Sequence, residues 1–357
     1  MSKLVTVNIE NYNEGGFKSY RIPGIVVSSK GTIIVYYETR LSAYDDWSAM
    51  GIGMKRSTDQ GKTFSNRQMI AIAEDLAVNN PVMIASQDGR IHFLWQKDYR
   101  QLFYQVSTDD GLTFSDPVSI LDAVTAFKEE YCWSLFAIGP GHGIEMRNGR
   151  LVVPIWLARG EGNNHYPTQV STLISDDGGT TWERGEIIYS SENWGDDFCW
   201  VNESQVVELS DGSVLINMRH NGSNRYRYIA ISPNGKDQFS KPVPDKQLPD
   251  AICFGSIVRD KDGKILFVNC ANNEEMRGNG WPKRIHLTVK MSYDDAKTWQ
   301  YAKQIAEVGG YADIATSPDG KTYYCFFEDG NPPENEEPAR LTLAIFGEAY
   351  LIEDIES

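Results

Sequence analysis

The sequence of 357 residues lacks several features that would assign a protein to a class at once. Its 34 Lys and Arg are outnumbered by 49 Asp and Glu, which gives a formal net charge of −15. This shortage of positive charge argues against a nucleic-acid partner. No apolar run approaches the roughly 18 residues of a membrane-spanning helix, and the first residues lack the basic and then apolar pattern of a signal peptide. We expect no membrane partner, and either a cytoplasmic location or secretion of a longer chain whose leader is not part of this sequence.

Cysteine is scarce as well. The chain has five cysteines, an odd number, and none lies in a CxxC pair or in a Cys/His cluster with metal-ligand spacing. This pattern predicts buried free thiols and neither a disulfide framework nor a bound metal. The five positions are Cys132, Cys199, Cys253, Cys270 and Cys325.

Long amphipathic helical patterns are absent, whereas aromatic residues and glycines are plentiful. The chain contains 9 Trp, 18 Tyr, 14 Phe and 31 Gly, a composition typical of many short strands joined by tight turns. With 41% hydrophobic residues the chain can bury a substantial core. No Pro/Ser-rich linker interrupts it, so we expect one domain over residues 1–357.

An eight-residue pattern, Ser-x-Asp-x-Gly-x-Thr-aromatic, recurs along the chain. Complete copies occupy 57–64, 107–114 and 175–182, and a fourth copy at 292–299 has Ala296 in place of Gly. A degenerate copy begins at Ser232, and successive copies start 50 to 68 residues apart. Asp, Gly, Ser and Thr are the residues of a tight turn, because Asp accepts backbone hydrogen bonds and Gly permits a positive φ.

Short β-rich stretches such as 31–38, 90–96, 150–158, 213–219 and 264–270 lie between the copies. A period near 60 residues corresponds to one four-stranded sheet, and the chain has room for about six such units. The sequence therefore predicts an all-β protein, a six-bladed β-propeller of four-stranded antiparallel sheets. In such a ring, loops far apart in sequence converge at one end of the central axis.

The segment Tyr20-Arg21-Ile22-Pro23 stands directly before the first β-rich stretch. Together with the repeated octapeptide, this Arg-Ile-Pro motif resembles the sialidases, or neuraminidases, whose six-bladed propeller carries the same turns as Asp-boxes, or BNR repeats. The resemblance runs from Tyr20 to the end of the repeat region. It implies an exo-α-sialidase that removes terminal α-linked sialic acid from a sialylated oligosaccharide and uses no metal or organic cofactor.

Sialic acid carries a carboxylate, for which a planar guanidinium is a suitable partner because it donates paired hydrogen bonds. The family uses three arginines for this purpose. The resemblance assigns these roles to Arg21, Arg219 and Arg284, with Arg277 as a rival for the third role. Arg40 resembles an auxiliary arginine near the same pocket.

The family's nucleophile is a tyrosine, which avoids the repulsion between two carboxylates; sialidases are known exceptions to the scheme of two catalytic carboxyl groups. By resemblance, Tyr311 in a Gly-Gly-Tyr context is the nucleophile, and Glu203, sixteen residues before Arg219, is its base. The two side chains should form a hydrogen-bonded pair. Glu208 is the competing carboxylate, but at an odd separation along a strand it would face the other side of the sheet.

The acid/base should be a carboxyl group on a loop over the axis. Asp46 precedes Trp47 and is favoured by resemblance, and the adjacent Asp45 remains an alternative. The implied reaction proceeds through a tyrosyl–sugar intermediate and retains the anomeric configuration.

Other residues are candidates for the pocket that holds the rest of the sugar. His142, in a glycine-rich turn, is more simply explained as structural, and most tryptophans of a β-protein belong to the core. The pocket candidates are Trp47, Asn80, Trp133, Trp194, Trp200 and Trp281.

The sequence leaves three alternatives open. Propellers with Asp-boxes also serve as non-catalytic sugar-binding modules, although the presence of Asp46, Glu203 and Tyr311 favours an enzyme. A related enzyme would be an intramolecular trans-sialidase, which releases an anhydro-sugar, or a hydrolase of deaminated nonulosonic acids. Linkage preference and oligomeric state are not encoded in any motif.

Overall fold

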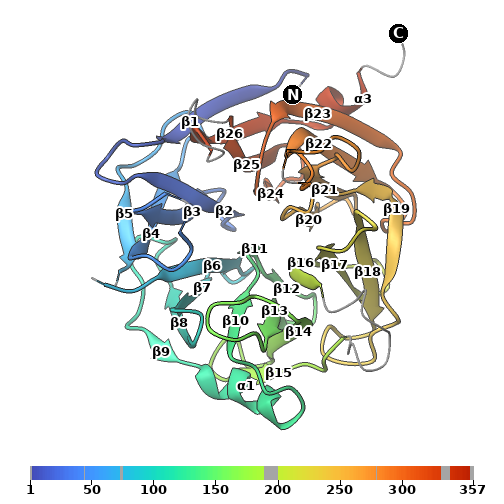
Figure 1. The fold of residues 1–357 in the computed structure, drawn as a ribbon. Helices are drawn as coiled ribbons and strands as arrows, with labels where there is room; N and C mark the ends of the chain where they lie inside the picture. Colours follow the sequence, from blue (N-terminus) through green and yellow to red (C-terminus); the bar gives the residue numbers. More distant parts are fainter. Residues whose placement is uncertain are drawn as a thin grey trace.

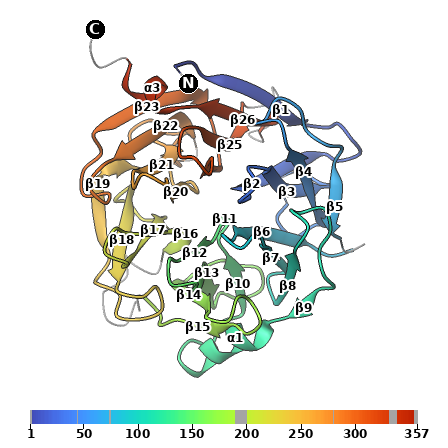
Figure 2. The same ribbon diagram turned by 180° about the vertical axis from the view of Figure 1, so that it is seen from behind.

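Six β-sheets form a ring around a central axis in this computed structural model (Figure 1). The structure describes residues 2–43, 45–72, 75–188, 200–278, 280–330 and 338–353. Seen from behind, the sheets again radiate outward like blades (Figure 2). The prediction of an all-β, six-bladed propeller is confirmed.

The first three sheets use the chain from Ser19 to Arg184. Each begins near the axis and ends at the rim. Blade 1 consists of β2 (Ser19–Val27), β3 (Ile33–Arg40), β4 (Met50–Ser57) and β5 (Gln68–Ala71). Blade 2 consists of β6 (Val78–Ala85), β7 (Ile91–Lys97), β8 (Gln101–Ser107) and β9 (Val118–Ser119). Blade 3 consists of β10 (Leu135–Ile138), β13 (Leu151–Ala158), β14 (Thr168–Ser175) and β15 (Glu183–Arg184).

The last three sheets complete the ring. Blade 4 consists of β16 (Val201–Glu208), β17 (Val214–His220), β18 (Tyr226–Ser232) and β19 (Val243–Pro249). Blade 5 consists of β20 (Ser256–Arg259), β21 (Ile265–Cys270), β22 (Ile285–Ser292) and β23 (Tyr301–Val308). Blade 6 consists of β24 (Ala312–Thr316), β25 (Tyr323–Asp329), β26 (Arg340–Phe346) and β1 (Val5–Asn11). Because β1 pairs antiparallel with β26, the two ends of the described chain close the ring together.

Two short strands extend the four-stranded pattern. The strand β11 (Gly141–His142) pairs in parallel with β6, and β12 (Ile144–Glu145) pairs with β13. Helices are confined to α1 (Leu121–Thr125), the 3₁₀ turn η1 (Ala126–Glu129) and α3 (Glu348–Ile352) within the described ranges. None of these helices is long and apolar enough to cross a membrane.

The repeated octapeptides all lie at the end of the third strand of a blade, where the chain turns toward the rim. In the first copy, Ser57 Oγ accepts the N–H of Gly61 at 2.9 Å, and Asp59 accepts both the N–H and the hydroxyl of Thr63 at 2.9 and 2.6 Å. The second, third and fourth copies repeat the Asp–Thr hydrogen bonds. Blades 1 to 5 carry these turns, and they position the outer strand of each blade.

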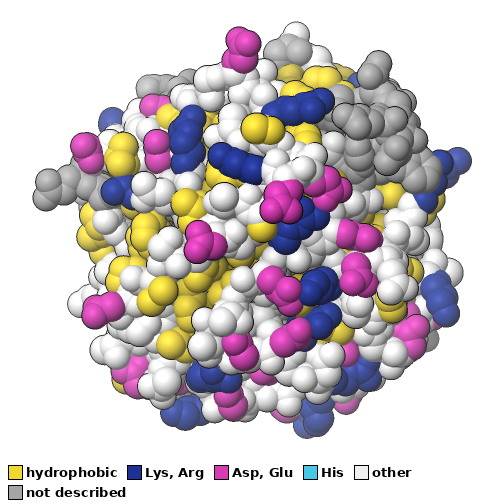
Figure 3. Space-filling view, turned by 90° about the horizontal axis from the view of Figure 1, so that it is seen from below, with side chains coloured by type: hydrophobic (Ala, Val, Ile, Leu, Met, Phe, Trp, Pro, Cys, Tyr) yellow, Lys and Arg dark blue, Asp and Glu magenta, His cyan; other side chains and the backbone are white. Residues whose placement is uncertain are grey.

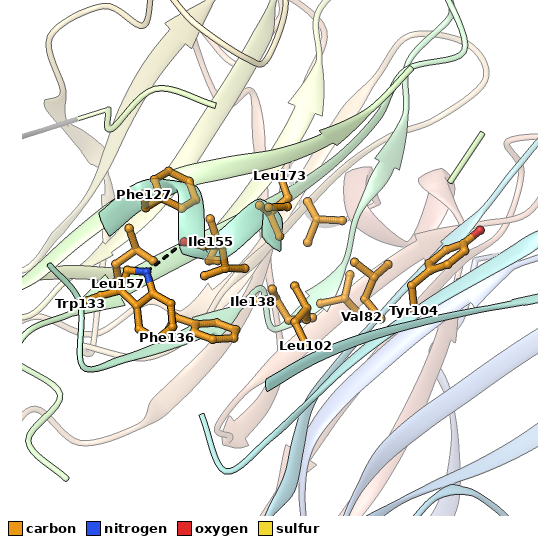
Figure 4. Close-up of a cluster of buried hydrophobic side chains, with 14 of the residues drawn as sticks. Val82, Leu102, Tyr104, Phe127, Trp133, Phe136, Ile138, Ile155, Leu157 and Leu173 are labelled. Atoms are coloured by element: carbon orange, nitrogen blue, oxygen red, sulfur yellow. Dashed lines mark hydrogen bonds between the residues drawn. The ribbon is translucent and has the colours of Figure 1, made fainter. Parts of the chain in front are cut away.

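The core lies between neighbouring blades. Leu102 of blade 2 packs with Phe136 and Leu157 of blade 3, and all three are fully buried (Figure 4). Trp133 joins the same cluster and donates its indole N–H to the carbonyl oxygen of Val124 at 2.9 Å. Burying one such side chain contributes roughly 1.5–3 kcal/mol, so this packing holds adjacent blades in a fixed relation.

Acidic and basic side chains are interspersed with apolar ones over the face shown in Figure 3. Many acidic groups are paired locally, as Arg150 with Asp176 at 2.7 Å and Arg184 with Glu130. The net negative charge is therefore spread over many surface groups, some of them paired with a cation. Arg21 and Arg219, in contrast, lie near the axis of the ring.

Candidate active site

The candidate residues converge at one end of the ring, where the innermost strands begin. Arg21 lies in β2, Glu203 in β16, and Tyr311 directly before β24. The opposite ends of these strands line a separate cavity of about 660 Å³, to which Glu208 and Thr316 contribute. The candidate site therefore lies at the face where the innermost strands begin, and the 660 Å³ cavity lies at the face where they end.

Three of the innermost strands have an irregular register at the site end. Pairing shifts between Arg21 and Gly24 in β2, between Asn79 and Val82 in β6, and between Val201 and Ser204 in β16. Such bulges change the direction of a side chain relative to a regular strand. The candidate residues Arg21 and Glu203 therefore lie where the alternation of a strand is broken.

The phenol of Tyr311 donates a hydrogen bond to Oε1 of Glu203. Arg219 contacts both groups, because its NH1 donates to Oε2 of Glu203 and, at 2.8 Å, to the phenol oxygen. All three residues are less than 10% exposed. The geometry can transfer the phenol proton to a carboxylate while a guanidinium stabilises negative charge on the phenol oxygen.

The pKa of Tyr311 is raised well above its usual value. Burial is the main cause and the negative charge of Glu203 adds to it, whereas Arg219 and Arg284 act in the opposite direction. The phenol is therefore protonated at neutral pH, which agrees with its role as the hydrogen-bond donor.

Arg21 is fixed by Glu328, a buried residue of β25. Its Nε donates to Oε1 of Glu328 at 2.6 Å, and Oε2 accepts the backbone N–H of Tyr311 at 3.0 Å. Gly310 makes this approach possible, since a Cβ there would lie 2.3 Å from Oε2 of Glu328. Sequence reasoning missed Glu328, because no repeat or motif marks this position.

Arg284, directly before β22, completes the group of cations around Tyr311. The guanidinium carbons of Arg284 and Arg21 lie 5.2 and 5.5 Å from the centre of the Tyr311 ring. Arg277, the rival from the sequence, donates its backbone N–H to Trp281 in a turn after β21. The structure brings Arg284 together with Arg21, Arg219 and the tyrosine.

Arg40 links Asp46 to the buried carboxylate of Glu38. Its NH2 donates to Glu38 at 2.6 Å, and its NH1 donates to Oδ1 of Asp46 at 2.7 Å. Burial alone would raise the pKa of Asp46, but the positive charges of Arg40 and Arg21 lower it to about 2. The Asp46 side chain is 47% exposed, so it is accessible from solvent while anchored at one oxygen.

Asp45, the alternative acid, closes the turn that carries Asp46. Its Oδ1 accepts the backbone N–H of Trp47 at 2.9 Å. The carboxylate in contact with the arginine group is therefore that of Asp46. Trp47 packs against the rings of Tyr99 and His165, with centroid distances of 4.6 and 5.8 Å.

A second series of hydrogen bonds, through Asn221 and Tyr166, holds the guanidinium of Arg219 in place. Its Nε donates to Oδ1 of Asn221 at 2.9 Å, and Asn221 in turn donates to the hydroxyl of Tyr166. The Tyr166 ring lies 4.8 Å from that of Trp200, which is 38% exposed. Tyr166 and Asn221 are further residues that the sequence did not single out.

The remaining candidates for the pocket lie in different surroundings. Trp133 is buried in the core between blades 2 and 3, so it does not line the site. Trp281 is 46% exposed, and Asn80 donates its backbone N–H to Glu38 at 2.9 Å. Trp194 lies outside the described residues.

Glu208 and His142, which the sequence analysis did not favour as catalytic residues, each contact another side chain. Glu208 accepts a hydrogen bond from Nε of Arg147 at 3.1 Å, toward the opposite face. His142 Nδ1 lies 2.8 Å from Oδ1 of Asp313. Asp313 also accepts the N–H of Ile25 at 2.8 Å and thereby ties innermost strands of different blades together.

The expectation of buried free thiols holds for three of the five cysteines and is wrong for one. Cys253, Cys270 and Cys325 are free and buried, whereas Cys132 is free and exposed in the loop before β10. Its neighbours in that loop, not its own side chain, provide the apolar contacts. Cys199 lies outside the described residues. No cluster of metal-ligating side chains is found in the described part of the chain.

Comparison with known proteins identifies the family that this sequence matches. The family model of the BNR repeat-like domain matches residues 68–324. The sialidase of Micromonospora viridifaciens is 28% identical over 352 residues, which cover 88% of this chain and 50% of the relative. The sialidase of Bacteroides fragilis is 28% identical over 335 residues, covering 84% and 57%. The chain thus spans about half the length of these curated relatives.

Solved structures support the fold. The Hadza microbial sialidase Hz136 superposes with a TM-score of 0.80 at 21% identity and covers 98% of this chain and 69% of its own. The intramolecular trans-sialidase from Ruminococcus gnavus superposes with a TM-score of 0.76 at 16% identity, covering 96% and 98%. Because the family model matches well over half of the sequence, the chain belongs to the family of the BNR repeat-like domain, and the relatives that it resembles over most of its length are sialidases.

Proposed function

We propose that this chain is an exo-α-sialidase, a retaining glycoside hydrolase that cleaves terminal α-linked sialic acid from sialylated oligosaccharides. The observation that carries the proposal is the hydrogen-bonded pair of Tyr311 and Glu203 at the point where three arginines converge. The similarity to sialidases supports the same activity.

The arginines Arg21, Arg219 and Arg284 would bind the carboxylate of the sugar. In the free protein, Glu328 and Glu203 neutralise part of their charge, yet each guanidinium has more donors than these contacts use. Among the described residues, no side-chain hydrogen bond of Arg284 is found, so its donors are available for an anion. An acidic protein can therefore hold an anionic sugar, because close contacts outweigh its distant surface charges.

Tyr311 would attack the anomeric carbon while Glu203 takes the phenol proton. A neutral phenol approaches an anionic substrate without the repulsion that a carboxylate would meet. The guanidinium of Arg219, 2.8 Å from the phenol oxygen, would stabilise the charge that develops as the proton leaves. The carbon–oxygen bond to the phenol forms as the bond to the leaving group breaks.

Asp46 would give its proton to the departing glycosidic oxygen and later take one from the attacking water. In the free protein the pKa of Asp46 is about 2 because of Arg40 and Arg21. Binding of the substrate carboxylate at Arg21 adds a negative charge nearby, which favours the protonated acid. Two displacements at the same carbon return the original anomeric configuration.

The identity of the product distinguishes hydrolysis by water from internal transfer to a hydroxyl group of the same sugar. Attack of water on the tyrosyl–sugar gives free sialic acid, whereas attack of one of the sugar's own hydroxyl groups gives an anhydro-sugar that is lighter by one water. We favour water, because Asp46 is accessible from solvent at the rim of the site. Incubation with sialyllactose isomers, followed by mass and NMR analysis, identifies both the product and the preferred linkage.

The central test compares two variants that each lose a single hydroxyl group. Tyr311→Phe should lower kcat for a fluorogenic sialoside by about 10³-fold or more, with an unchanged thermal midpoint. Tyr324→Phe, in a buried cluster between blades 6 and 1, should retain normal turnover. If the wild-type chain binds sialosides without cleaving them, it is a sugar-binding propeller. Near-normal hydrolysis by Tyr311→Phe would remove Tyr311 from the mechanism.

A further inference from the structure

Glu38 is a fully buried carboxylate that the proposed reaction does not use, and both of its oxygens have partners. It lies on β3 two residues before Arg40, so the two side chains point to the same face of the strand. Its Oε2 accepts hydrogen bonds from both Nε and NH2 of Arg40, at 2.9 and 2.6 Å. Its Oε1 accepts the backbone N–H of Asn80 at 2.9 Å, in the bulge of β6. Glu38 thus fixes the plane of the Arg40 guanidinium between two blades.

Arg40 has one nitrogen left for Asp46. Because Nε and NH2 are turned toward Glu38, only NH1 reaches Asp46, and it donates to Oδ1 at 2.7 Å. Among the described residues, no hydrogen bond to Oδ2 of Asp46 is found, and the Asp46 side chain is 47% exposed. One oxygen of this carboxyl group is therefore anchored, while the other is available to carry a proton.

A guanidinium without such a restraint prefers a different contact with a carboxylate. It forms a fork of two parallel hydrogen bonds, one to each oxygen, and this contact favours the ionised carboxylate. Arg40 is only 1% exposed. Without Glu38, the carboxylate of Asp46 would be the one anion still paired with Arg40 among the described residues. A forked contact would occupy both oxygens of Asp46, and the acid could not hold its proton.

We propose that Glu38 is a positioning residue, which restricts Arg40 to a single hydrogen bond with Asp46 and so keeps Oδ2 of Asp46 available for the catalytic proton. During cleavage this proton passes from Oδ2 to the glycosidic oxygen as the bond between that oxygen and the anomeric carbon breaks. Arg40 stabilises the carboxylate that remains, through Oδ1. The catalytic consequence rests on the proposed function, in which Asp46 is the acid, whereas the restraint on Arg40 does not.

The restraint is tested by a crystal structure of the full chain with Glu38→Gln. The substitution keeps the shape of the side chain and removes its charge. The single amide oxygen can face either Arg40 or the N–H of Asn80, and not both. We expect the guanidinium of Arg40 to donate to both oxygens of Asp46 in this variant. An Arg40 that still donates to Oδ1 alone would overturn the proposal.

The consequence for catalysis is measured as kcat on sialyllactose and on a fluorogenic sialoside. Glu38→Gln should lower kcat on sialyllactose at least about tenfold. The loss should be smaller on the fluorogenic substrate, whose phenolic leaving group needs less help from an acid. KM should change little, because the three arginines proposed to bind the carboxylate of the sugar are retained. A loss of equal size on both substrates would show that Glu38 only supports the fold.

The matched control is Glu10→Gln, which removes another buried carboxylate. Glu10 lies on β1 and pairs with Lys55 and Arg67, each at 3.1 Å. This variant should lose stability but keep the wild-type ratio of the two kcat values. A ratio that changes as much as in Glu38→Gln would mean that the loss of any buried carboxylate produces the effect, and would overturn the specific role of Glu38.

A double variant, Glu38→Gln with Arg40→Gln, tests whether Glu38 acts through Arg40. It removes both charges of the buried pair and leaves neither without a partner, so it keeps the test open if the single variant fails to fold. Its ratio of kcat on the fluorogenic substrate to kcat on sialyllactose should stay close to that of the wild type, because no guanidinium of residue 40 then contacts Asp46. A ratio about tenfold or more above the wild-type value would overturn the route through Arg40.

Failure of the proposed function is distinguishable from failure of this inference. A wild-type chain that cleaves neither substrate would overturn the proposed function. The crystal structure of Glu38→Gln would still decide whether Glu38 restrains Arg40.

Discussion

Oε1 of Glu328 accepts a hydrogen bond from Nε of Arg21 at 2.6 Å. The carboxylate is fully buried, and its other oxygen holds the backbone of Tyr311. Burial would raise the pKa of Glu328, yet the charges of Arg21 and Arg284 keep it below the usual value. One buried anion therefore positions a substrate-binding cation and the loop of the nucleophile together.

Glu328→Gln should destabilise the protein by about 3–5 kcal/mol, because it leaves the charge of Arg21 without its buried partner. It should also lower kcat/KM. The control is Asp329→Asn on the same strand, which weakens an ion pair with Arg340, a side chain that is 50% exposed; this change should cost no more than about 1 kcal/mol. Urea unfolding measures both variants. Equal effects would mean that Glu328 has no special role in supporting Arg21.

Glu203→Gln should lower kcat by about 10²–10⁴-fold, because an amide cannot take the proton of Tyr311. The matched control is Glu208→Gln, five residues further along β16, which faces Arg147 on the other side of the ring. Its turnover should stay close to that of the wild type. Steady-state kinetics on a fluorogenic sialoside compare the two, and a larger loss for the Glu208 variant would reassign the base.

Asp46→Asn should impair cleavage of sialyllactose by about 10²–10⁴-fold, since the sugar leaving group needs a proton. The loss should be smaller with a fluorogenic sialoside, whose phenolic leaving group departs more easily. Asp45→Asn should show no such dependence on the leaving group, because Asp45 only closes the turn. If the dependence appears in the Asp45 variant instead, the acid is Asp45.

The turns of the repeated octapeptides should contribute to stability at neutral pH and lose that contribution in acid. Hydrogen bonds from Thr63 lower the pKa of Asp59 to about 2, and those from Thr113 lower the pKa of Asp109 to about 2. Because these values lie below the usual pKa of about 3.9, the stabilisation is complete above pH 4 and is lost as the pH falls toward 2. The double variant Asp59→Asn, Asp109→Asn should be less stable at pH 7.

The stability difference between that double variant and the wild type should narrow between pH 4 and pH 2. Chemical unfolding at several pH values measures it, with Asp116→Asn as a control outside the turns. A difference that stays constant over this range would show that the turns do not depend on ionised aspartates.

Ala296→Gly should stabilise the protein by about 0.5–1 kcal/mol. Ala296 has φ of +60° at the position where the other complete copies have Gly, a conformation that is unfavourable for a residue with a Cβ. The reverse change, Gly61→Ala, should be destabilising, since its Cβ would lie 2.6 Å from Cδ1 of Ile345. Thermal unfolding compares the two. A lower midpoint for Ala296→Gly would indicate that apolar packing of the methyl group outweighs the backbone strain.

The repeat predicted the propeller fold, and the resemblance named candidate residues that the structure brings close together. The octapeptides predicted tight turns, because their turn chemistry depends only on residues within eight positions of one another, and in the structure these turns end the third strand of blades 1 to 5. The second strands, such as β13 and β17, were visible as apolar runs because they are buried on both faces. The innermost strands β2, β6 and β16 were not visible as regular strand patterns, because their pairing register shifts at the end that carries the candidate site.

The sequence by itself predicted about six repeating units and the turns between their strands, and its resemblance to the sialidases named the candidate arginines, Tyr311 and Glu203, with Arg277 as a rival to Arg284. Only the tertiary structure decided which residues hold them, namely Glu328 for Arg21 and for the backbone of Tyr311, and Asn221 for Arg219. The physical reason is distance along the chain. Turn hydrogen bonds are local and leave a pattern in the sequence, whereas Arg21 and Glu328 are 307 residues apart and meet only because the ring closes.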